Sequence, residues 1–497
     1  MKSLSNKVKL LGIFVGVLLA AGCKGPETVV VNQSPTAITP ADTTQQVTPT
    51  NEASFRKLVI GEFAPIKTLD PLYADNAASM RAVQLVYEGL VRLNDNGSPV
   101  PGLAKTWAVS KDSLQYTFHL RPNIYFQDNQ IFNTGTGRKV TASDVKYDFE
   151  RMAQAGLPPH AAHMFMDIEN YEPYYREQHF VYNPQNRGLD GVSGIQVPND
   201  STVVFQLVNR DPKFLKKLAT PFAVIYPREA VGNSVSSFSP VGAGPFNFAQ
   251  QTSDSTLIFS KFQNYYAAKD IDLNRIDIVQ NESESQLFRS MSANDIYLLP
   301  QLGPQLFQNV LNSDGSLINS YAKRYTLQRP GGNTEYVLRY NSQNHLMLSE
   351  AHKIVSFIPT DTSSYFKQFP DTYITMNSST DSLKNTSPVN NDRVYTVYSD
   401  DPFVRTFFGK LSTTLASHQI SLQMMQTRTP TRNTGLFFTQ NLPLIPNKQW
   451  DQYPALFRFK VQQVALQRSE IKGLNFNGYP WWFNPRGVTL PAEEKLN

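Results

Sequence analysis

The chain lacks the features that mark several classes of protein. It has one cysteine in 497 residues, which excludes an internal disulfide framework. Its 46 basic side chains nearly balance 41 acidic ones, and no run of five like charges provides an electrostatic footprint for nucleic acid. No apolar run reaches 18 residues, so no segment is long enough to cross a bilayer. With 40% hydrophobic residues, the chain is instead expected to fold into two or three lobes with their own cores.

Motifs for catalysis and metal binding are also missing from the sequence. We find no P-loop, dinucleotide-binding glycine fingerprint, nucleophile elbow or HExxH motif, so we expect no enzymatic activity, cofactor or metal. His160 and His163 have the spacing of two ligands on one helical face, but prolines flank them and no cysteine is near, which favours a surface pair. Glu282 and Glu284 alternate as on a strand, where we expect a solvated edge.

The N-terminus has the pattern of an export signal. Three lysines precede an apolar run of about a dozen residues, 10–21, and the sole cysteine, Cys23, follows Gly22. The end of this run resembles the bacterial lipobox, which implies that Cys23 is acylated and anchors the chain to a lipid bilayer; the alternative is an unmodified cysteine in a leader. Residues 24–54 contain seven threonines, four prolines and no aromatic residue, a composition that predicts a disordered tether.

Hydrophobic periodicity predicts mixed strands and helices from Phe55 onward. Thr141 and Asp144 form a predicted capping box at the start of a helix. Near the C-terminus, a strand, a helix and a strand follow one another, which predicts a parallel pair of strands in a second lobe. The expected strands lie near 58–63, 114–120, 203–207, 393–398 and 420–424, and the expected helices near 80–90, 141–152, 212–218 and 402–415.

Six segments in the first half of the chain carry motifs, and the order of these motifs along the chain is informative about its family. They are TLDPLYA (68–74), VYEGLVRLNDNG (86–97), PGLAKTWAVSKDSLQYTFHLRPNIYF (101–126), VTASDVKYDFERM (140–152), SPVGAGPF (239–246) and NYY (264–266). Together they resemble the bacterial family 5 extracellular solute-binding proteins, the oligopeptide, dipeptide and nickel receptors of ABC importers. The resemblance implies an α/β, two-lobed, periplasmic-binding-protein-like fold of type II, with an extra subdomain in the first lobe.

The second half resembles the family less closely. RPGGNTEYVLRYN (329–341), the strand–helix–strand segment (394–425) and a closing segment (453–478) are similar to it. Two departures stand out: Ser349–Asp361 lacks the helix pattern usual after the first of these segments, and only 27 residues separate Met425 from Tyr453. We therefore expect a reduced second lobe.

The patterns and the resemblance predict a division of the chain. The parts are a lipoprotein signal peptide (1–22), a lipidated cysteine and tether (23–54), a first lobe (55–280) with an extra subdomain at about 100–190, a shortened second lobe (281–455), a return to the first lobe (456–490) and a tail (491–497).

The function implied by the resemblance is that of a lipid-anchored, solute-binding component of an ABC importer on the extracytoplasmic (periplasmic) side of the cell envelope. Its partners would be a peptide-like or other small polar solute, held between the lobes by hinge closure, an ABC permease and the lipid bilayer. The alternative is a non-transport envelope lipoprotein that keeps the fold and binds a protein partner. A polar, concave wall within Ser349–Gln452 favours solute capture, whereas a filled or absent cleft favours the alternative.

Family topology also implies ligand-binding positions. Tyr73 and Asn76 follow the first strand, and Gly244 lies in the bend at 239–246. Asp451, with Trp450 and Tyr453, partly matches the Trp-x-x-Asp-Tyr context in which peptide-binding members hold a peptide's amino terminus. Asp451 is thus a candidate ammonium anchor, although it also aligns with the closing segment.

Overall fold

The computed structural model describes most of the chain after the tether. The described residues are 56–232, 237–280, 282–343, 346–358, 374–378, 394–399, 401–425, 435–445, 451–476 and 479–491, all within one compact unit, Ser54–Asn497. The predicted signal peptide, Cys23 and the tether lie outside these residues and stay predictions. None of the helices within the described ranges is long and apolar enough to span a membrane.

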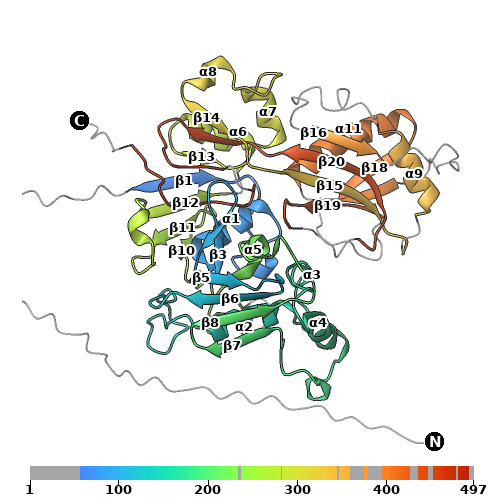
Figure 1. Ribbon diagram of the computed structural model, residues 1–497. Helices are drawn as coiled ribbons and strands as arrows, with labels where there is room; N and C mark the ends of the chain where they lie inside the picture. The colour runs from blue at the N-terminus through green and yellow to red at the C-terminus, as the bar shows by residue number, and fades with distance from the viewer. Residues whose placement is uncertain are drawn as a thin grey trace, which may run out of the picture. The chain divides into compact units, whose positions relative to one another are not determined.

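A seven-stranded mixed sheet joins segments that are far apart in the sequence (Figure 1). The predicted first strand lies in its middle, because β1 pairs in parallel with β12 and β13 on either side. In sheet order, the strands are β10 (Phe246–Gln251), β11 (Leu257–Lys261), β12 (Arg275–Val279), β1 (Lys57–Gly61), β13 (Leu298–Leu299), β21 (Ala465–Arg468) and β14 (Tyr325–Gln328).

The extra subdomain contains a four-stranded antiparallel sheet in the order β5-β6-β8-β7. Thr141 forms the predicted capping box with Asp144 at the start of α2, and α2 buries the predicted stripe of Val145, Phe149 and Met152. The bounds are β5 (Ala104–Val109), β6 (Gln115–Leu120), β7 (Ile195–Asn199), β8 (Thr202–Gln206), α2 (Ala142–Met152), α3 (Pro159–His163) and α4 (Tyr171–Phe180).

Short elements connect this subdomain to the seven-stranded sheet. Asn76 caps α1 at its N-terminus, and Tyr87 follows the last helical residue. The elements are the 3₁₀ helix η1 (Pro71–Tyr73), α1 (Ala77–Val86), the pair β2 (Glu88–Gly89) with β9 (Val224–Ile225), the pair β3 (Val91–Leu93) with β4 (Pro99–Pro101), and α5 (Phe214–Lys217).

A six-stranded sheet forms the core of the second lobe, in the order β16-β20-β15-β19-β17-β18. The predicted parallel pair is confirmed: α11 (Pro402–Ser417) joins β17 (Val394–Tyr398) to β18 (Ser421–Met425), which pair in parallel. The remaining elements are β15 (Asn333–Tyr340), β16 (Ile374–Ser378), β19 (Leu436–Asn441), β20 (Ala455–Gln462) and α9 (Leu348–Ser356). Thus part of the segment that lacks the family's helix pattern is nevertheless helical.

The sheets divide the chain at other residues than expected. Strands β13 and β14 belong to the seven-stranded sheet, so that sheet continues past residue 280. Strand β20 belongs to the six-stranded sheet, so the chain returns to the first lobe after residue 462 rather than after 455. The extra subdomain likewise extends to Gln206. Strand pairing between distant segments decides these boundaries, and local periodicity does not report it. The reduction of the second lobe stays a prediction.

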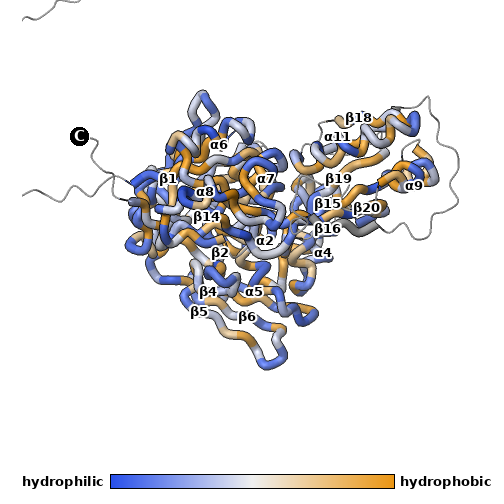
Figure 2. The backbone as a smooth tube through the Cα atoms, turned by 90° about the horizontal axis from the view of Figure 1, so that it is seen from above, coloured by the Kyte–Doolittle hydropathy of each residue, from blue (hydrophilic) through white to orange (hydrophobic). Residues whose placement is uncertain are grey.

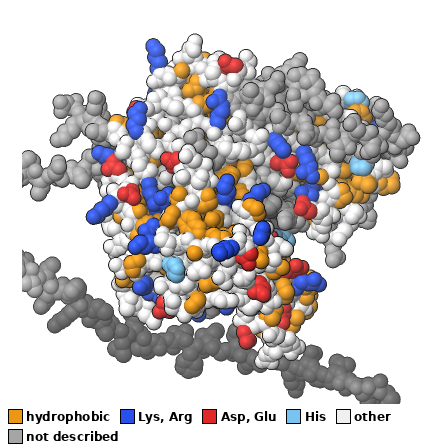
Figure 3. Space-filling model, viewed as in Figure 1, with side chains coloured by type: hydrophobic (Ala, Val, Ile, Leu, Met, Phe, Trp, Pro, Cys, Tyr) orange, Lys and Arg blue, Asp and Glu red, His pale blue; other side chains and the backbone are white. Residues whose placement is uncertain are grey.

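Two hydrophobic clusters underlie these sheets. Hydrophobic positions recur along the strands and helices, as Figure 2 shows, while many peripheral loops are hydrophilic. The second cluster combines the six-stranded sheet with α6 (Glu284–Ser292) and α7 (Pro304–Val310), next to the short α8 (Asn319–Ala322). On the face shown in Figure 3, basic and acidic side chains are interspersed, in agreement with the nearly balanced charge.

The expected strand edge at Glu282 and Glu284 is wrong. Ser283 instead caps α6 through a capping box with Gln286, a signal that the sequence carries as Ser-x-x-Gln. The Glu284 carboxylate accepts hydrogen bonds from the backbone nitrogens of Gln305 (3.0 Å) and Leu306 (3.1 Å) at the start of α7. Burial raises its pKa to about 7. This carboxylate therefore joins two helices.

Candidate functional site

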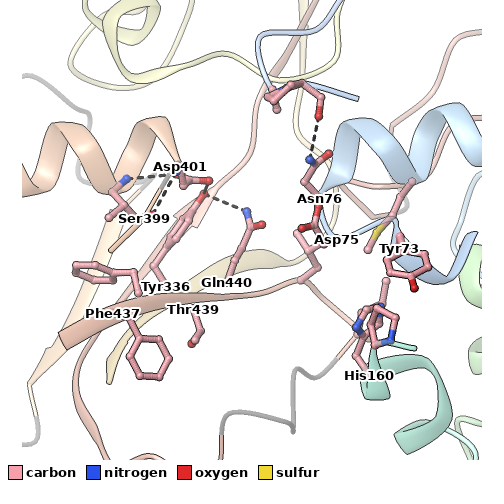
Figure 4. A pocket seen from close by; sticks show the side chains of 18 of the residues that line it. Tyr73, Asp75, Asn76, His160, Tyr336, Ser399, Asp401, Phe437, Thr439 and Gln440 are labelled. Atoms are coloured by element: carbon pink, nitrogen blue, oxygen red, sulfur yellow. Dashed lines mark hydrogen bonds between the residues drawn. The ribbon is translucent and has the colours of Figure 1, made fainter. Parts of the chain in front are cut away.

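A cavity of about 470 Å³ lies between the first part of the fold and the second lobe. One wall comes from the segment after β1, from α3 and from the loop before it. The other comes from β15, from β19, from the segment that follows β17 and from the start of α11. Figure 4 shows Tyr73, Asp75, Asn76 and His160 opposite Tyr336, Asp401, Phe437 and Gln440. Polar groups thus line a cavity that also has aromatic and aliphatic surface, as ligand sites commonly do.

Two predicted ligand-binding residues, Tyr73 and Asn76, lie on the first wall. Asn76 accepts a hydrogen bond from the Ser79 backbone nitrogen (2.8 Å) and donates to the Pro65 carbonyl (3.1 Å). It therefore holds α1 and the preceding loop in place. Tyr73 differs, because its hydroxyl is buried and has no hydrogen-bond partner among the described residues.

A buried ion pair positions Tyr73. The Asp70 carboxylate caps η1 by accepting a hydrogen bond from the Leu72 backbone nitrogen (3.1 Å). Arg151 of α2 holds that carboxylate with two hydrogen bonds (3.0 and 2.5 Å) and also donates to the Tyr226 hydroxyl (2.9 Å). Asp70 and Arg151 are only 3% and 4% exposed. The extra subdomain thus holds the 3₁₀ turn that carries Tyr73 through the contact of Arg151 with Asp70.

The other two predicted ligand-binding residues do not line this cavity. Gly244 lies behind the first wall, where its nitrogen donates to the Val86 carbonyl (2.9 Å) and an added Cβ would come within 2.6 Å of the Tyr87 nitrogen. Glycine is needed there for close packing. Asp451 pairs with Arg339 (3.0 Å), is 65% exposed and borders a different hollow on the six-stranded sheet. Trp450 lies outside the described residues, and both ligand-binding roles stay predictions.

The second wall contains polar side chains at the C-terminal end of β17. Asp401 caps α11 by accepting hydrogen bonds from the backbone nitrogens of Phe403 (2.8 Å) and Val404 (3.2 Å). It also accepts one from the Tyr336 hydroxyl (3.2 Å), to which Gln440 donates in turn (3.3 Å). Burial and the nearby Asp401 carboxylate raise the pKa of Tyr336, so its hydroxyl stays protonated.

The expectation that His160 and His163 form a surface pair is wrong for His160. This side chain is 8% exposed, lines the cavity and packs edge-on against Phe222, with ring centroids 4.7 Å apart. Burial, with a smaller contribution from His163, lowers its pKa to about 4, so the ring is neutral at neutral pH. Among the described lining residues there are two carboxylates, Asp75 and Asp401, and no lysine or arginine. The cavity therefore favours cationic and hydrogen-bond-donating groups.

Sequence reasoning missed the second wall although the signal was present. The unit formed by β17, α11 and β18 was predicted, and ligands commonly bind beyond the carboxyl ends of parallel strands. Asp401 lies at that position, as does Ser399. Phe437 and Thr439 of β19 had no comparable local signal, since only the pairing of β19 beside β17 brings them to the cavity.

Comparisons with known proteins agree with this architecture. Residues 98–357 match the family described as "Bacterial extracellular solute-binding proteins, family 5 Middle". The dipeptide-binding protein of Escherichia coli strain K12 is 28% identical over 253 residues, 49% of this chain and 42% of that protein. Heme-binding protein A of Haemophilus influenzae is 26% identical over 282 residues, 55% of this chain and 47% of that protein. The chain thus spans less than half the length of these relatives.

Solved structures agree on the fold. The crystal structure of Haemophilus influenzae OppA in complex with RPPGFSPFR has a TM-score of 0.69 at 13% identity, covering 88% of this chain and 99% of that one. At this identity the likeness concerns the fold alone. It confirms the predicted periplasmic-binding-protein-like architecture of mixed α/β sheets.

Proposed function

The chain belongs to the family 5 bacterial extracellular solute-binding proteins, and on this premise we propose that it captures a peptide-like or small polar solute and delivers it to an ABC permease. The observation that carries the proposal is the open cavity between the two walls. Lining residues that include Ser399, Asp401, Thr439 and Gln440 supply a concave and partly polar wall, which favours solute capture over the alternative of a surface that binds only a protein partner. The names of the relatives, which include dipeptide-binding proteins, support a peptide.

Within the described residues, the chain crosses between the two sheets twice, which supports hinge closure. It passes from β14 to β15 through residues 329–332 and from β20 to β21 through residues 463–464. Short paired crossings of this kind are places where a few residues absorb the rotation of one lobe against another. A ligand that contacts both walls would favour the closed state, because only a difference in affinity between open and closed states shifts their populations.

Peptides with a free amino terminus are expected to stabilise the full chain, because the described residues that line the cavity include two carboxylates and no lysine or arginine. At 100 times the dissociation constant, a ligand should add about 2.7 kcal/mol in a thermal-shift assay. N-acetylation should weaken binding roughly 10-fold or more, as expected for loss of a hydrogen bond to a charged group. The same peptide should reduce the radius of gyration in solution scattering if the lobes close.

Two matched variants test which carboxylate binds the free amino terminus of the peptide. Asp401→Asn removes the charge and retains a good helix cap, so we expect it to abolish most of the preference for a free amino terminus. Asp451→Asn alters a carboxylate outside the cavity and should leave the preference unchanged. The reverse pattern would make Asp451 the anchor. No stabilisation by any peptide pool would favour the protein-partner alternative.

Lipid anchoring through Cys23 is the remaining part of the proposal. The motif supports it, and the body supplies no membrane-spanning helix among its described residues. We expect Cys23→Ser to move the protein from the membrane fraction to the soluble fraction and to abolish incorporation of labelled fatty acid in cells. Equal labelling of the variant would refute acylation at this cysteine.

A further inference from the structure

Two polar atoms on the first wall of the cavity have no partner within the described structure. The Tyr73 hydroxyl and the His160 Nε2 atom are both buried, and neither makes a hydrogen bond. Both side chains line the cavity, and Figure 4 shows them on the same side of it. A buried polar group without a partner carries a desolvation cost, so such groups at a ligand cavity point to a partner that the ligand supplies.

The bonding of His160 determines which role its free nitrogen can take. A contact between the ring and the Leu72 backbone acts to raise the pKa of His160, the direction expected where a ring N–H donates to a backbone carbonyl. Since Nε2 has no partner within the described structure, we assign the ring hydrogen to Nδ1. In the neutral ring, Nε2 then has a lone pair and can only accept. Leu72 precedes Tyr73, so this bond ties the His160 ring to the turn that carries Tyr73.

We propose that Tyr73 and His160 together recognise an amide group of the ligand. The Tyr73 hydroxyl would donate to the amide oxygen, and His160 Nε2 would accept the amide N–H. The inference rests on the proposed solute-binding function of this cavity and specifies the chemistry of one part of the ligand.

Other groups match the pair less well. A carboxylate offers acceptors only and would be repelled by the Nε2 lone pair. An ammonium offers donors only and leaves the Tyr73 hydroxyl without an acceptor. Both atoms are covered by protein in this structure. The Tyr73 residue as a whole is only partly buried, and its hydroxyl makes no hydrogen bond within the described structure. The Tyr73 side chain can therefore move without breaking a hydrogen bond.

Small amides test the pair directly on the wild-type full chain. We would label the histidines with ¹⁵N and titrate N-methylacetamide, which has both a donor and an acceptor, against N,N-dimethylacetamide, which has only the acceptor. N-methylacetamide is expected to shift the His160 Nε2 resonance saturably, and N,N-dimethylacetamide to shift it much less. Equal shifts from the two amides, or none, would overturn the proposed role of His160.

Variants extend the test to a peptide that stabilises the wild-type chain. Tyr73→Phe and His160→Asn should each weaken its affinity about 10-fold, because each leaves a ligand polar group unpaired. In His160→Asn, the asparagine keeps a donor near the Nδ1 position and places no polar group near Nε2. In His160→Gln, the longer side chain places an amide near Nε2, so this variant should bind the peptide more tightly than His160→Asn.

The outcomes separate this inference from the proposed function. Unchanged peptide affinity in Tyr73→Phe and His160→Asn would refute the inference while the peptide-binding function stands. If N-methylacetamide acts on His160 but no peptide stabilises the chain, the amide site stands and the peptide-binding function fails.

Discussion

Replacing Arg151 with Met is expected to lower the free energy of unfolding by about 3–5 kcal/mol, the usual cost of leaving one partner of a buried ion pair uncompensated. Met approximates the length of the arginine stem but cannot donate to the Asp70 carboxylate or to the Tyr226 hydroxyl. Asp70 is 3% exposed, so water cannot replace the guanidinium. The loss should appear as a lower midpoint in urea unfolding followed by circular dichroism.

An exposed ion pair on α4 provides the matched control for Arg151→Met. Arg176 and Glu172 lie 4.0 Å apart and are 69% and 61% exposed, so Arg176→Met should change the free energy of unfolding by about 0.5 kcal/mol or less. Adding Asp70→Asn to Arg151→Met should recover part of the loss, because asparagine carries no charge and can still cap η1. Equal effects of Arg151→Met and Arg176→Met would show that the buried pair does not hold this part of the fold.

The same ion pair connects stability to the site. Asp70 fixes the turn that carries Tyr73, and Arg151 reaches it from the extra subdomain. Asp70 and Arg151 both lie in segments that resemble the family. No local sequence signal, however, indicated that these two residues, 81 positions apart, form an ion pair. Contacts of this kind come from tertiary packing, which periodicity and capping signals do not report.

Local signals were sufficient for several of the individual elements. Thr141 and Asp144 predicted the start of α2, and the proline after Asp401 predicted the start of α11. The order of strand, helix and strand also predicted the parallel pairing of β17 and β18. These predictions succeeded because a cap or an apolar stripe acts over three or four residues of one segment.

The candidate site could be predicted only in part for the same reason. Tyr73 and Asn76 were indicated by the resemblance, and they line the cavity. Gly244 was indicated as well, but it is needed where β10 begins close to the backbone of Val86 and Tyr87. His160 was expected at the surface because its neighbours are prolines, whereas packing against Phe222 buries it. Burial of one polar residue depends on which distant segment covers it.

Burial of His160 should also make the folded chain less stable in acid. The ring takes up a proton near pH 6.5 in the unfolded chain, but in the folded chain only near pH 4. Between these values the unfolded state binds more protons, so stability falls as the pH falls, and none of this loss is present above pH 6.5. The full difference corresponds to about 3 kcal/mol and is reached below pH 4.

Glu284 acts in the opposite direction over an overlapping range, so the wild-type curve alone does not isolate His160. Its carboxyl has a pKa of about 7 in the folded chain against 4.5 for an ordinary glutamate, so it makes the chain less stable as the pH rises between these values. The informative quantity is the free energy of unfolding of wild type minus that of His160→Gln, measured in urea from pH 7.5 to pH 4. Because glutamine does not titrate, the Glu284 contribution cancels, and the difference should fall by up to about 3 kcal/mol as the pH is lowered. A difference that stays constant over this range would show that His160 accepts a proton as readily in the folded chain as in the unfolded one, and that the cavity wall around it is open to water.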